Sequence, residues 1–300
     1  MRSIKAITAC LKGRLAGLVG GATPVTATRF PGPGDFVGSY DPRTADVRDG
    51  GQSTYNGSIA VTLLERSLVE QVLPGDLSLA RRADSGSTHP VIHLFGHQRD
   101  LMLVQGGNPQ PAGADDYQEM ILLIPFVVRG SGTKWHSFVV RMYLDDAAAV
   151  ALGNAVYAYA KLLAQLTESG PAENLTLQVL LLSEPFFEGN VKQAGPWRSS
   201  GNASATLPRW SDVQEIFSMP LVGADVVLGT VVRVVCSYWE WDYAAAEVAP
   251  ATSQHQFLQP FREGTQDWPQ LGLLSSAPDG AFAIRGLRWR LAEQPPPCSF

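Results

Sequence analysis

Continuous and alternating apolar runs predict that most of the chain is strand. Residues 117–128 (YQEMILLIPFVV) and 135–143 (WHSFVVRMY) are rich in apolar, β-branched and aromatic residues, and the turn sequence GSGT lies between them. Similar composition predicts further strands at residues 90–95, 175–182, 225–243 and 281–291. This pattern indicates an α+β fold with much antiparallel sheet.

One principal helix is predicted in mid-chain. Asp145 and Asp146 form an N-cap pair before AAAVALGNAVYAYAKLLAQL, which is rich in Ala and Leu and should be helical to about Glu168. On that helix Lys161 would lie in a polar stripe, opposite an apolar one. From periodicity alone, Lys161 is therefore interpreted as an exposed lysine of an amphipathic helix.

The remaining segments predict one short helix and several loops. The sequence LLERSLVEQVLP is typical of a short helix that Pro74 ends. Residues 20–54 and 105–116 are rich in Gly, Pro and Asp and predict loops, and residues 189–211 and 246–279 are also predicted to be irregular. We therefore expect an N-terminal extension and loop draped on the body at 1–54, a single domain at 55–294, and a flexible tail at 295–300.

Composition excludes several classes of function. The formal net charge is −5, the pI is about 5.5, and no basic cluster with interleaved aromatic residues occurs, which argues against nucleic-acid binding. No apolar run reaches the roughly 18 residues that a membrane helix needs. Lys12 and Arg14 interrupt the apolar N-terminus, so a secretory signal is not expected. Three cysteines, an odd number without metal-ligand spacing, do not indicate a disulfide framework. A cytoplasmic location is expected.

Two motifs could carry chemistry but are better explained by structure. His89, His93 and His97 are spaced four apart in a strand-like segment. Residues four apart in a strand are separated by about 13 Å, too far for two imidazoles to bind one ion. We therefore expect no metal site there. In YWEWDY, residues 238–243, acidic and aromatic residues alternate, which favours a half-buried strand with a solvated face over a binding wall.

Glu119 is a carboxylate in an otherwise apolar strand. It shares a face with Tyr117 and Ile121 if the segment is extended. Such a residue is most often a satisfied charge at the edge of a sheet. If it faces a cavity instead, desolvation would raise its pKa and it could transfer protons.

The segment MYLDDAAAVALGNAVYAYAKLL, residues 142–163, resembles the signature region of the acetoacetate decarboxylase superfamily. That family carries the pattern M-Y-L-D-N-x-P-A-x-A-x-G-R-E-x-x-x-Y-P-K-K. A second segment, YQEMILLIPFVVRG, resembles the family's Y-x-E strand, and VLPGDLSL at residues 72–79 is a weaker third match. The three matches cover roughly residues 55–165. The residues in register are Met142, Tyr143, Leu144, Asp145, Ala149, Ala151, Gly153, Tyr159 and Lys161, with Tyr117, Glu119, Ile124, Pro125 and Gly130 upstream.

The resemblance implies a fold and a chemistry. The fold would be a curved, barrel-like, mainly antiparallel sheet with packed helices. Lys161 would form a Schiff base with a substrate ketone, and Glu119 would handle protons or organise the lysine. The imine itself would be the electron sink, so no metal or organic cofactor is required. Family members are homo-oligomers, which is expected here too.

The chain departs from the family pattern at several positions. Leu162 replaces the second lysine, Ala160 the proline, and Asn154-Ala155 the Arg-Glu pair. The family's carboxylate-binding arginine falls at Tyr55, although Arg48 lies just upstream. A second family carboxylate falls near Phe95. The resemblance therefore preserves the lysine and one glutamate but loses other groups used in decarboxylation.

Three hypotheses for function follow. The first is a carbon–carbon lyase that decarboxylates a small β-keto acid through a lysine iminium and enamine. The second is an aldolase-dehydratase acting on pyruvate-like 2-oxo acids with the same lysine. The third is a non-catalytic ligand-binding relative. Lys161 and Glu119 are the candidate catalytic residues, and the candidate substrate-binding residues are Tyr117, Gln118, Tyr55, Arg48, Tyr157 and Tyr159.

Overall fold

The computed structural model describes residues 29–41, 50–112, 116–227, 230–259, 261–263, 266–268 and 271–292. Most of the predicted N-terminal extension and the whole of the predicted tail lie outside these residues, as does Arg48. The division into extension, domain and tail therefore stays a prediction.

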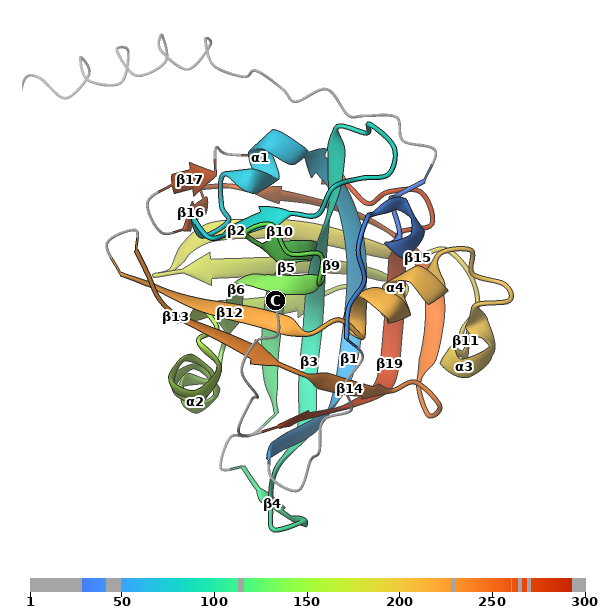
Figure 1. Ribbon diagram of the computed structural model, residues 1–300. Helices are drawn as coiled ribbons and strands as arrows, with labels where there is room; N and C mark the ends of the chain where they lie inside the picture. The colour runs from blue at the N-terminus through green and yellow to red at the C-terminus, as the bar shows by residue number, and fades with distance from the viewer. Residues whose placement is uncertain are drawn as a thin grey trace, which may run out of the picture.

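Strands dominate the described chain (Figure 1). The strands are β1 (Gly50–Glu65), β2 (Leu77–Leu79), β3 (Thr88–Gln105), β4 (Asn108–Pro111), β5 (Tyr117–Arg129), β6 (His136–Leu144), β7 (Lys161–Leu163), β8 (Gln165–Ser169), β9 (Asn174–Leu181), β10 (Glu184–Gln193), β11 (Arg198–Ser199), β12 (Leu221–Val227), β13 (Thr230–Ser237), β14 (Trp239–Asp242), β15 (Glu247–Phe257), β16 (Phe261–Glu263), β17 (Gln266–Trp268), β18 (Leu274–Ser275) and β19 (Ala281–Ala292). The helices are the 3-10 turn η1 (Pro33–Asp35) and the α-helices α1 (Arg66–Glu70), α2 (Ala147–Tyr157), α3 (Ser200–Ala203) and α4 (Trp210–Phe217).

The long strands form one curved sheet. Strands β19, β1, β3, β5 and β6 pair antiparallel in that order. The free edge of β6 pairs in parallel with β7 and, over two residues, with β12. On the other side of β19, the order continues through β15, β10, β9 and β8. The predicted α+β class and curved sheet are confirmed, although the described strands do not make a regular closed barrel.

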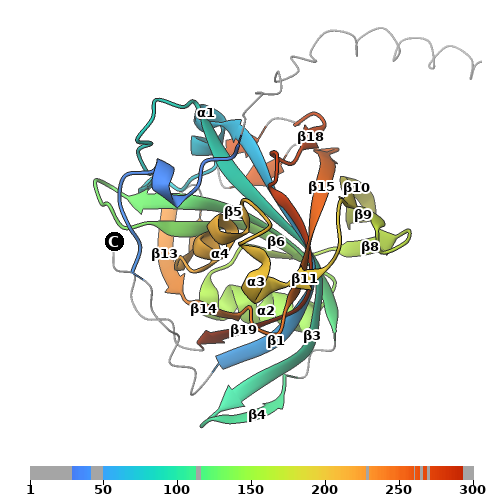
Figure 2. The ribbon, with the colours of Figure 1, turned by 90° about the vertical axis from the view of Figure 1, so that its right-hand side faces the viewer.

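The sheet is buried on both faces, which explains why its strands are almost continuously apolar. Ile121 and Leu123 of β5 pack into a first core together with α4, whereas Met120 and Leu122 point into a second core together with β9 and β10. Figure 2 shows α4 on one side of the long strands and β8, β9 and β10 on the other. The face of the sheet toward α4 is called the first core, and the face toward β9 and β10 the second core.

The principal helix is shorter than predicted. Asp146 caps α2, because its side chain accepts a hydrogen bond from the backbone N–H of Ala149 at 2.7 Å. The helix ends at Tyr157, and Ala158 has a left-handed backbone with φ of 51°. Residues 161–163 instead pair with β6 as a strand. The prediction of a helix to Glu168 is wrong because this strand pairing overrides the helical propensity of the Ala- and Leu-rich sequence.

Two segments predicted to be irregular contain regular elements. Between residues 189 and 211 lie the end of β10, β11, α3 and the start of α4. Between residues 246 and 279 lies β15, in which buried positions alternate but include Ser253 and His255. Hydrophobicity did not predict this strand because small and polar side chains occupy buried positions in it.

Two further expectations bear on location. Among the described residues, no helix is both long and apolar enough to cross a membrane. Cys236 on β13 is fully buried and disulfide-bonded, which the odd number of cysteines did not indicate. A cytoplasmic location stays a prediction.

Candidate active site

The candidate acid–base residue Glu119 lies on the face of β5 that points into the first core. It stands opposite Gly96 of β3 and Leu144 of β6, and only 2% of its surface is exposed. A carboxylate so enclosed loses its hydration, and this desolvation raises the pKa of Glu119 above its ordinary value. Glu119 is therefore not a charge at a solvated edge.

Two glycines make room for an aromatic ring beside Glu119. Gly57 of β1 and Gly96 of β3 are directly opposite in the ladder. A Cβ on Gly96 would lie 2.9 Å from Cε2 of Tyr55, and one on Gly57 would lie 2.7 Å from its hydroxyl oxygen. The Tyr55 hydroxyl donates to the carbonyl of Ser58 at 3.0 Å. Burial, and then the charge of Glu119, raises the pKa of Tyr55, so its hydroxyl remains protonated.

A hydrogen-bonded chain orients Glu119. The indole N–H of Trp289 donates to Oε1 of Gln98 at 2.7 Å, and Nε2 of Gln98 donates to Oε1 of Glu119 at 2.5 Å. Because an indole N–H can only donate, the amide oxygen of Gln98 must face Trp289 and its NH₂ group must face Glu119. This hydrogen bond lowers the pKa of Glu119 but does not outweigh the effect of burial.

Lys161 begins β7, opposite Met142 of β6, and so lies two strands from Glu119. The residue retains some exposed surface, but its amine is enclosed by protein atoms and donates to the carbonyl of Ala149 at 3.3 Å. Desolvation lowers the pKa of Lys161 below its ordinary value, and the charges of Glu119 and Asp146 oppose that shift. The interpretation of Lys161 as an exposed helical lysine is therefore wrong.

Lys161 and Glu119 influence each other electrostatically. The charge of Lys161 lowers the pKa of Glu119, and the charge of Glu119 raises that of Lys161. In both residues desolvation is the larger effect, so burial favours the neutral amine and the neutral acid. Each charge is therefore close enough to shift the pKa of the other group.

Three predicted tyrosines also line the first core. Tyr117 shares the face of β5 with Glu119, and burial followed by the Glu119 charge raises its pKa. Tyr157 and Tyr159 stack with ring centroids 5.5 Å apart. The hydroxyl of Tyr159 is hydrogen-bonded to Oγ of Ser237 and accepts from the indole N–H of Trp239 at 3.2 Å. These tyrosines are placed near the candidate site, but their roles stay predictions.

Other sequence candidates lie elsewhere. Gln118 points to the opposite face of β5, where its amide contacts His97, and His97 is 2.6 Å from a carboxylate oxygen of Glu168. Phe95 packs into the second core. Within the described residues, no group of three or more His, Cys, Asp or Glu side chains is arranged to hold a metal ion.

Sequence analysis missed Gln98 and Trp289. The second family carboxylate was expected near Phe95, but Gln98, three residues later and opposite Tyr117 of β5, is the residue that donates to the carboxylate of Glu119. Trp289 comes from β19, almost 200 residues further along the chain. A lone amide within a long strand was the only local signal for Gln98, and nothing local indicated Trp289.

A small cavity lies in the first core, and neither Lys161 nor Glu119 lines it. Its volume is about 10 Å³, which is enough for about one water molecule. Trp239 and Trp241 form one wall, whereas Glu240 and Asp242 are exposed, as expected for a half-buried strand. The other lining residues are Leu94, Ile121, Leu123, Met142, Phe217 and Leu221.

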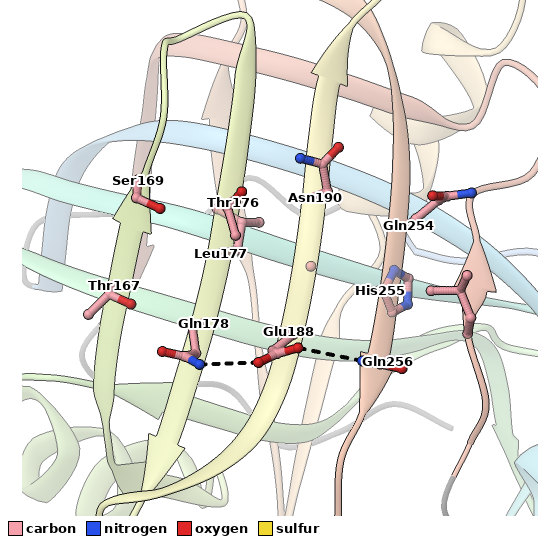
Figure 3. A pocket seen from close by; sticks show the side chains of 12 residues that line it. Thr167, Ser169, Thr176, Leu177, Gln178, Glu188, Asn190, Gln254, His255 and Gln256 are labelled. Atoms are coloured by element: carbon pink, nitrogen blue, oxygen red, sulfur yellow. Dashed lines mark hydrogen bonds between the residues drawn. The ribbon is translucent and has the colours of Figure 1, made fainter.

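Two larger grooves lie away from the lysine. One, of about 630 Å³, is lined by residues of β1, β3, β14 and β19, including Trp241 and Trp289. The other, of about 400 Å³, is a polar groove across β8, β9, β10 and β15 (Figure 3). Lys161 and Glu119 line neither groove. The volume of a groove therefore does not indicate where Lys161 and Glu119, the two groups with shifted pKa values, are found.

Comparison with known proteins supports the fold. No protein-family model matches the sequence. No curated protein matches it either. Among solved structures, the enduracididine biosynthesis enzyme MppR, complexed with the condensation product of pyruvate and imidazole 4-carboxaldehyde, is 13% identical with a TM-score of 0.53. That match covers 81% of this chain and 86% of the other.

Acetoacetate decarboxylases are similar in structure as well. The enzyme from Legionella pneumophila subsp. pneumophila str. Philadelphia 1 is 15% identical, with a TM-score of 0.51 over 84% of this chain and 92% of the other. Another acetoacetate decarboxylase is 13% identical, with a TM-score of 0.51 over 84% of this chain and 88% of the other. The resemblance detected in the sequence is thus confirmed at the level of the fold, and this chain has the fold of the acetoacetate decarboxylase-like enzymes.

Proposed function

We propose that this protein is a carbon–carbon lyase in which Lys161 forms a Schiff base with a small keto acid. The observation that carries the proposal is the enclosed amine of Lys161, whose pKa is lowered by desolvation, in electrostatic contact with the enclosed carboxyl of Glu119. A free lysine is neutral in only about one molecule in a few thousand at pH 7, and each unit by which the pKa falls raises that fraction about tenfold. Burial would therefore lower the pKa of Lys161 in place of the family's second lysine, whose position is occupied by Leu162.

The chemistry follows from the neutral amine. Nζ of Lys161 attacks the ketone carbon, a C–N bond forms, and the carbonyl oxygen leaves as water to give an iminium. When the bond to the carboxylate breaks, CO₂ departs and the electron pair moves into the iminium to give an enamine. Glu119 then donates a proton to the enamine carbon, and water releases the product from Lys161.

A second candidate reaction uses the same intermediate. Here Glu119 removes a proton next to the iminium, and the resulting enamine attacks an aldehyde before water is eliminated. The observation that favours it is the structural similarity to MppR, whose structure contains a condensation product of pyruvate and an aldehyde. A non-catalytic binding role is favoured by the loss of the family's second lysine and carboxylate-binding arginine, which fall at Leu162 and Tyr55 here.

Reductive trapping tests the proposal. The protein is incubated with acetoacetate or pyruvate, reduced with borohydride, digested, and the peptide that contains Lys161 is weighed. We expect an adduct on Lys161 in the wild type and none in Lys161→Met. Lys134→Met is the matched control, because Lys134 is a partly exposed amine in an ion pair with Asp41 at 2.5 Å.

The outcomes separate the three functions. An adduct together with CO₂ release supports the decarboxylase. An adduct without CO₂ release, but with condensation when an aldehyde is added, supports the aldolase-dehydratase. If neither keto acid gives an adduct on Lys161, the Schiff-base function is contradicted and the binding role remains.

A further inference from the structure

The side chain of Asn154 holds the backbone of Lys161 at both of its polar groups. The N–H of Lys161 donates to Oδ1 of Asn154 at 2.8 Å, and Nδ2 of Asn154 donates to the carbonyl of Lys161 at 3.0 Å. Asn154 thus supplies the donor and acceptor that a neighbouring strand would offer to this residue. Because both ends of the amide are used, the Cα of Lys161 has a fixed position relative to α2.

The neighbouring Gly153 provides the space in which the lysine side chain lies. A Cβ at Gly153 would be 2.2 Å from Cε of Lys161, 2.4 Å from Cδ and 2.6 Å from Nζ. Real side chains do not approach so closely, so any residue with a Cβ would displace the amine. Glycine is unfavourable in a helix interior relative to alanine, and here it coincides with the slot for the lysine.

Asn154 is itself held in place from a distant strand. Arg233 of β13 donates from Nη2 to the carbonyl of Asn154 and from Nη1 to the carbonyl of Ala155, both at 2.9 Å. The last carbonyls of a helix lack helical partners, and a cation there is favourable. Arg233 therefore holds the end of α2 in place, and Asn154 in turn holds the backbone of Lys161.

We propose that Asn154 and Gly153 are positioning residues that keep the amine of Lys161 in an enclosed slot over α2, close to Glu119. What the amine does there rests on the proposed function, whereas its placement is a property of the chain alone. Asn154 stands where the resembled family pattern has arginine, so this clamp would be a device of this chain. The two hydrogen bonds are possible because α2 ends at Tyr157, since Lys161 could not meet Asn154 in this way within one continuous helix.

The test measures the amine without any substrate. The full-length protein is labelled with acetic anhydride from pH 6 to 11, and the acetylated Lys161 and Lys134 peptides are quantified by mass spectrometry. The variants are Asn154→Ala and Gly153→Ala. Asn190→Ala is the matched control, because Asn190 also makes two side-chain hydrogen bonds, to Asn174 and Leu175, in the distant β9–β10 pair.

We expect the labelling midpoint of Lys161 to shift to higher pH in Asn154→Ala and Gly153→Ala, by about one unit, because an amine freed from the slot regains water. One unit corresponds to about a tenfold smaller neutral fraction at pH 7. The midpoints of Lys134 in every variant, and of Lys161 in Asn190→Ala, should not move. Gly153→Ala replaces glycine by the best helix former, so a loss of folding would not explain its shift.

An unchanged Lys161 midpoint in the folded variants overturns the positioning role. The proposed function is judged separately by trapping with keto acids. If the wild type gives no adduct but the two variants still shift the midpoint, the positioning role stands and the Schiff-base function fails. If the adduct forms and the midpoint does not move, the Schiff-base function stands and the positioning role fails.

Discussion

Two carboxylates in this molecule accept hydrogen bonds from glutamine side chains, yet their surroundings differ completely. Glu119 accepts from Gln98 inside the first core, where the charge of Lys161 lowers its pKa. Glu188 lies in the polar groove, where Gln178 donates to it at 3.3 Å and Gln256 at 3.5 Å (Figure 3). The chemical groups are alike, but water reaches only the second pair freely.

The comparison shows why the larger hollow is the weaker candidate for chemistry. In the groove, water can solvate a carboxylate, so the amide donors add little to what solvent already supplies. In the first core, solvent is excluded. Burial therefore raises the pKa of Glu119 and lowers the pKa of Lys161, which favours the neutral form of each group. The proposed chemistry therefore depends on enclosure of the two groups, and the volume of a groove does not indicate it.

The largest effect is expected for Glu119→Gln. The amide keeps the shape and a partner for Gln98 but cannot transfer a proton, so deuterium exchange into the methyl group of pyruvate should slow by about 100-fold. The labelling midpoint of Lys161 should move to lower pH, because the charge of Glu119 raises the pKa of that lysine. Exchange followed by NMR, together with acetic anhydride labelling, measures both. An unchanged exchange rate would remove Glu119 from the mechanism.

A smaller effect is expected for Gln98→Ala. The pKa of Glu119 should rise, because the hydrogen bond from Gln98 lowers it. The acid limb of the exchange rate against pH should therefore move to higher pH, with a rate change of about tenfold. Loss of the buried acceptor for Trp289 should also cost about 1–3 kcal/mol of the free energy of unfolding. Trp289→Phe is the control, since it leaves the bond to Glu119 intact and should not move the acid limb.

His255 lines the polar groove and packs against His93. This pair tests the effect of burial on residues that have no part in the proposed reaction. His93 and His255 lie with ring centroids 4.2 Å apart; desolvation lowers the pKa of His255 to about 4 and that of His93 well below its ordinary value. Both are neutral when folded, so they contribute stability above their unfolded pKa of about 6.5. That stability is lost as the pH falls toward 4, by up to about 1.4 kcal/mol per pH unit for each histidine.

The variant His93→Leu sharpens this point. Both ring nitrogens of His93 are buried without a hydrogen-bond partner among the described residues, so the substitution removes no such bond. Urea unfolding from pH 7 to pH 4.5 should show a smaller loss of stability in the variant than in the wild type, and trapping on Lys161 should not change. Equal acid sensitivity in the two proteins would show that this pair is not the origin of the effect.

The smallest effect is expected for Glu188→Gln. The groove is open to solvent, so the free energy of unfolding should change by less than about 0.5 kcal/mol. Trapping of keto acids and the labelling midpoint of Lys161 should match the wild type. A loss of trapping in this variant would reverse the comparison and make the groove the site to pursue.

Sequence analysis predicted the strands β5 and β6 well because their apolar runs are long and bounded by clear turn signals. Glu119 stood out as a carboxylate in an apolar strand, whereas Lys161 became a candidate only through the resemblance, since periodicity alone assigned it to a solvated helix face. Sequence analysis missed β15 and α4 because polar or small residues occupy buried positions in the first, and the second is short. Gln98 had only a weak local signal and Trp289 had none, because their roles depend on side-chain contacts between strands, one of them across almost 200 residues.

The sequence by itself determined the strand-rich α+β class and the Asp146 cap of the principal helix, and it made Lys161 and Glu119 the candidates for the proposed chemistry. These follow from local composition and from matches to a pattern. The tertiary structure decided where that helix ends and which face of β5 encloses Glu119. It also decided that the Lys161 side chain lies against Gly153 while Asn154 hydrogen-bonds the Lys161 backbone. The reason is physical: desolvation and strand pairing arise from atoms far apart in the chain, so they exist only once the sheet has assembled.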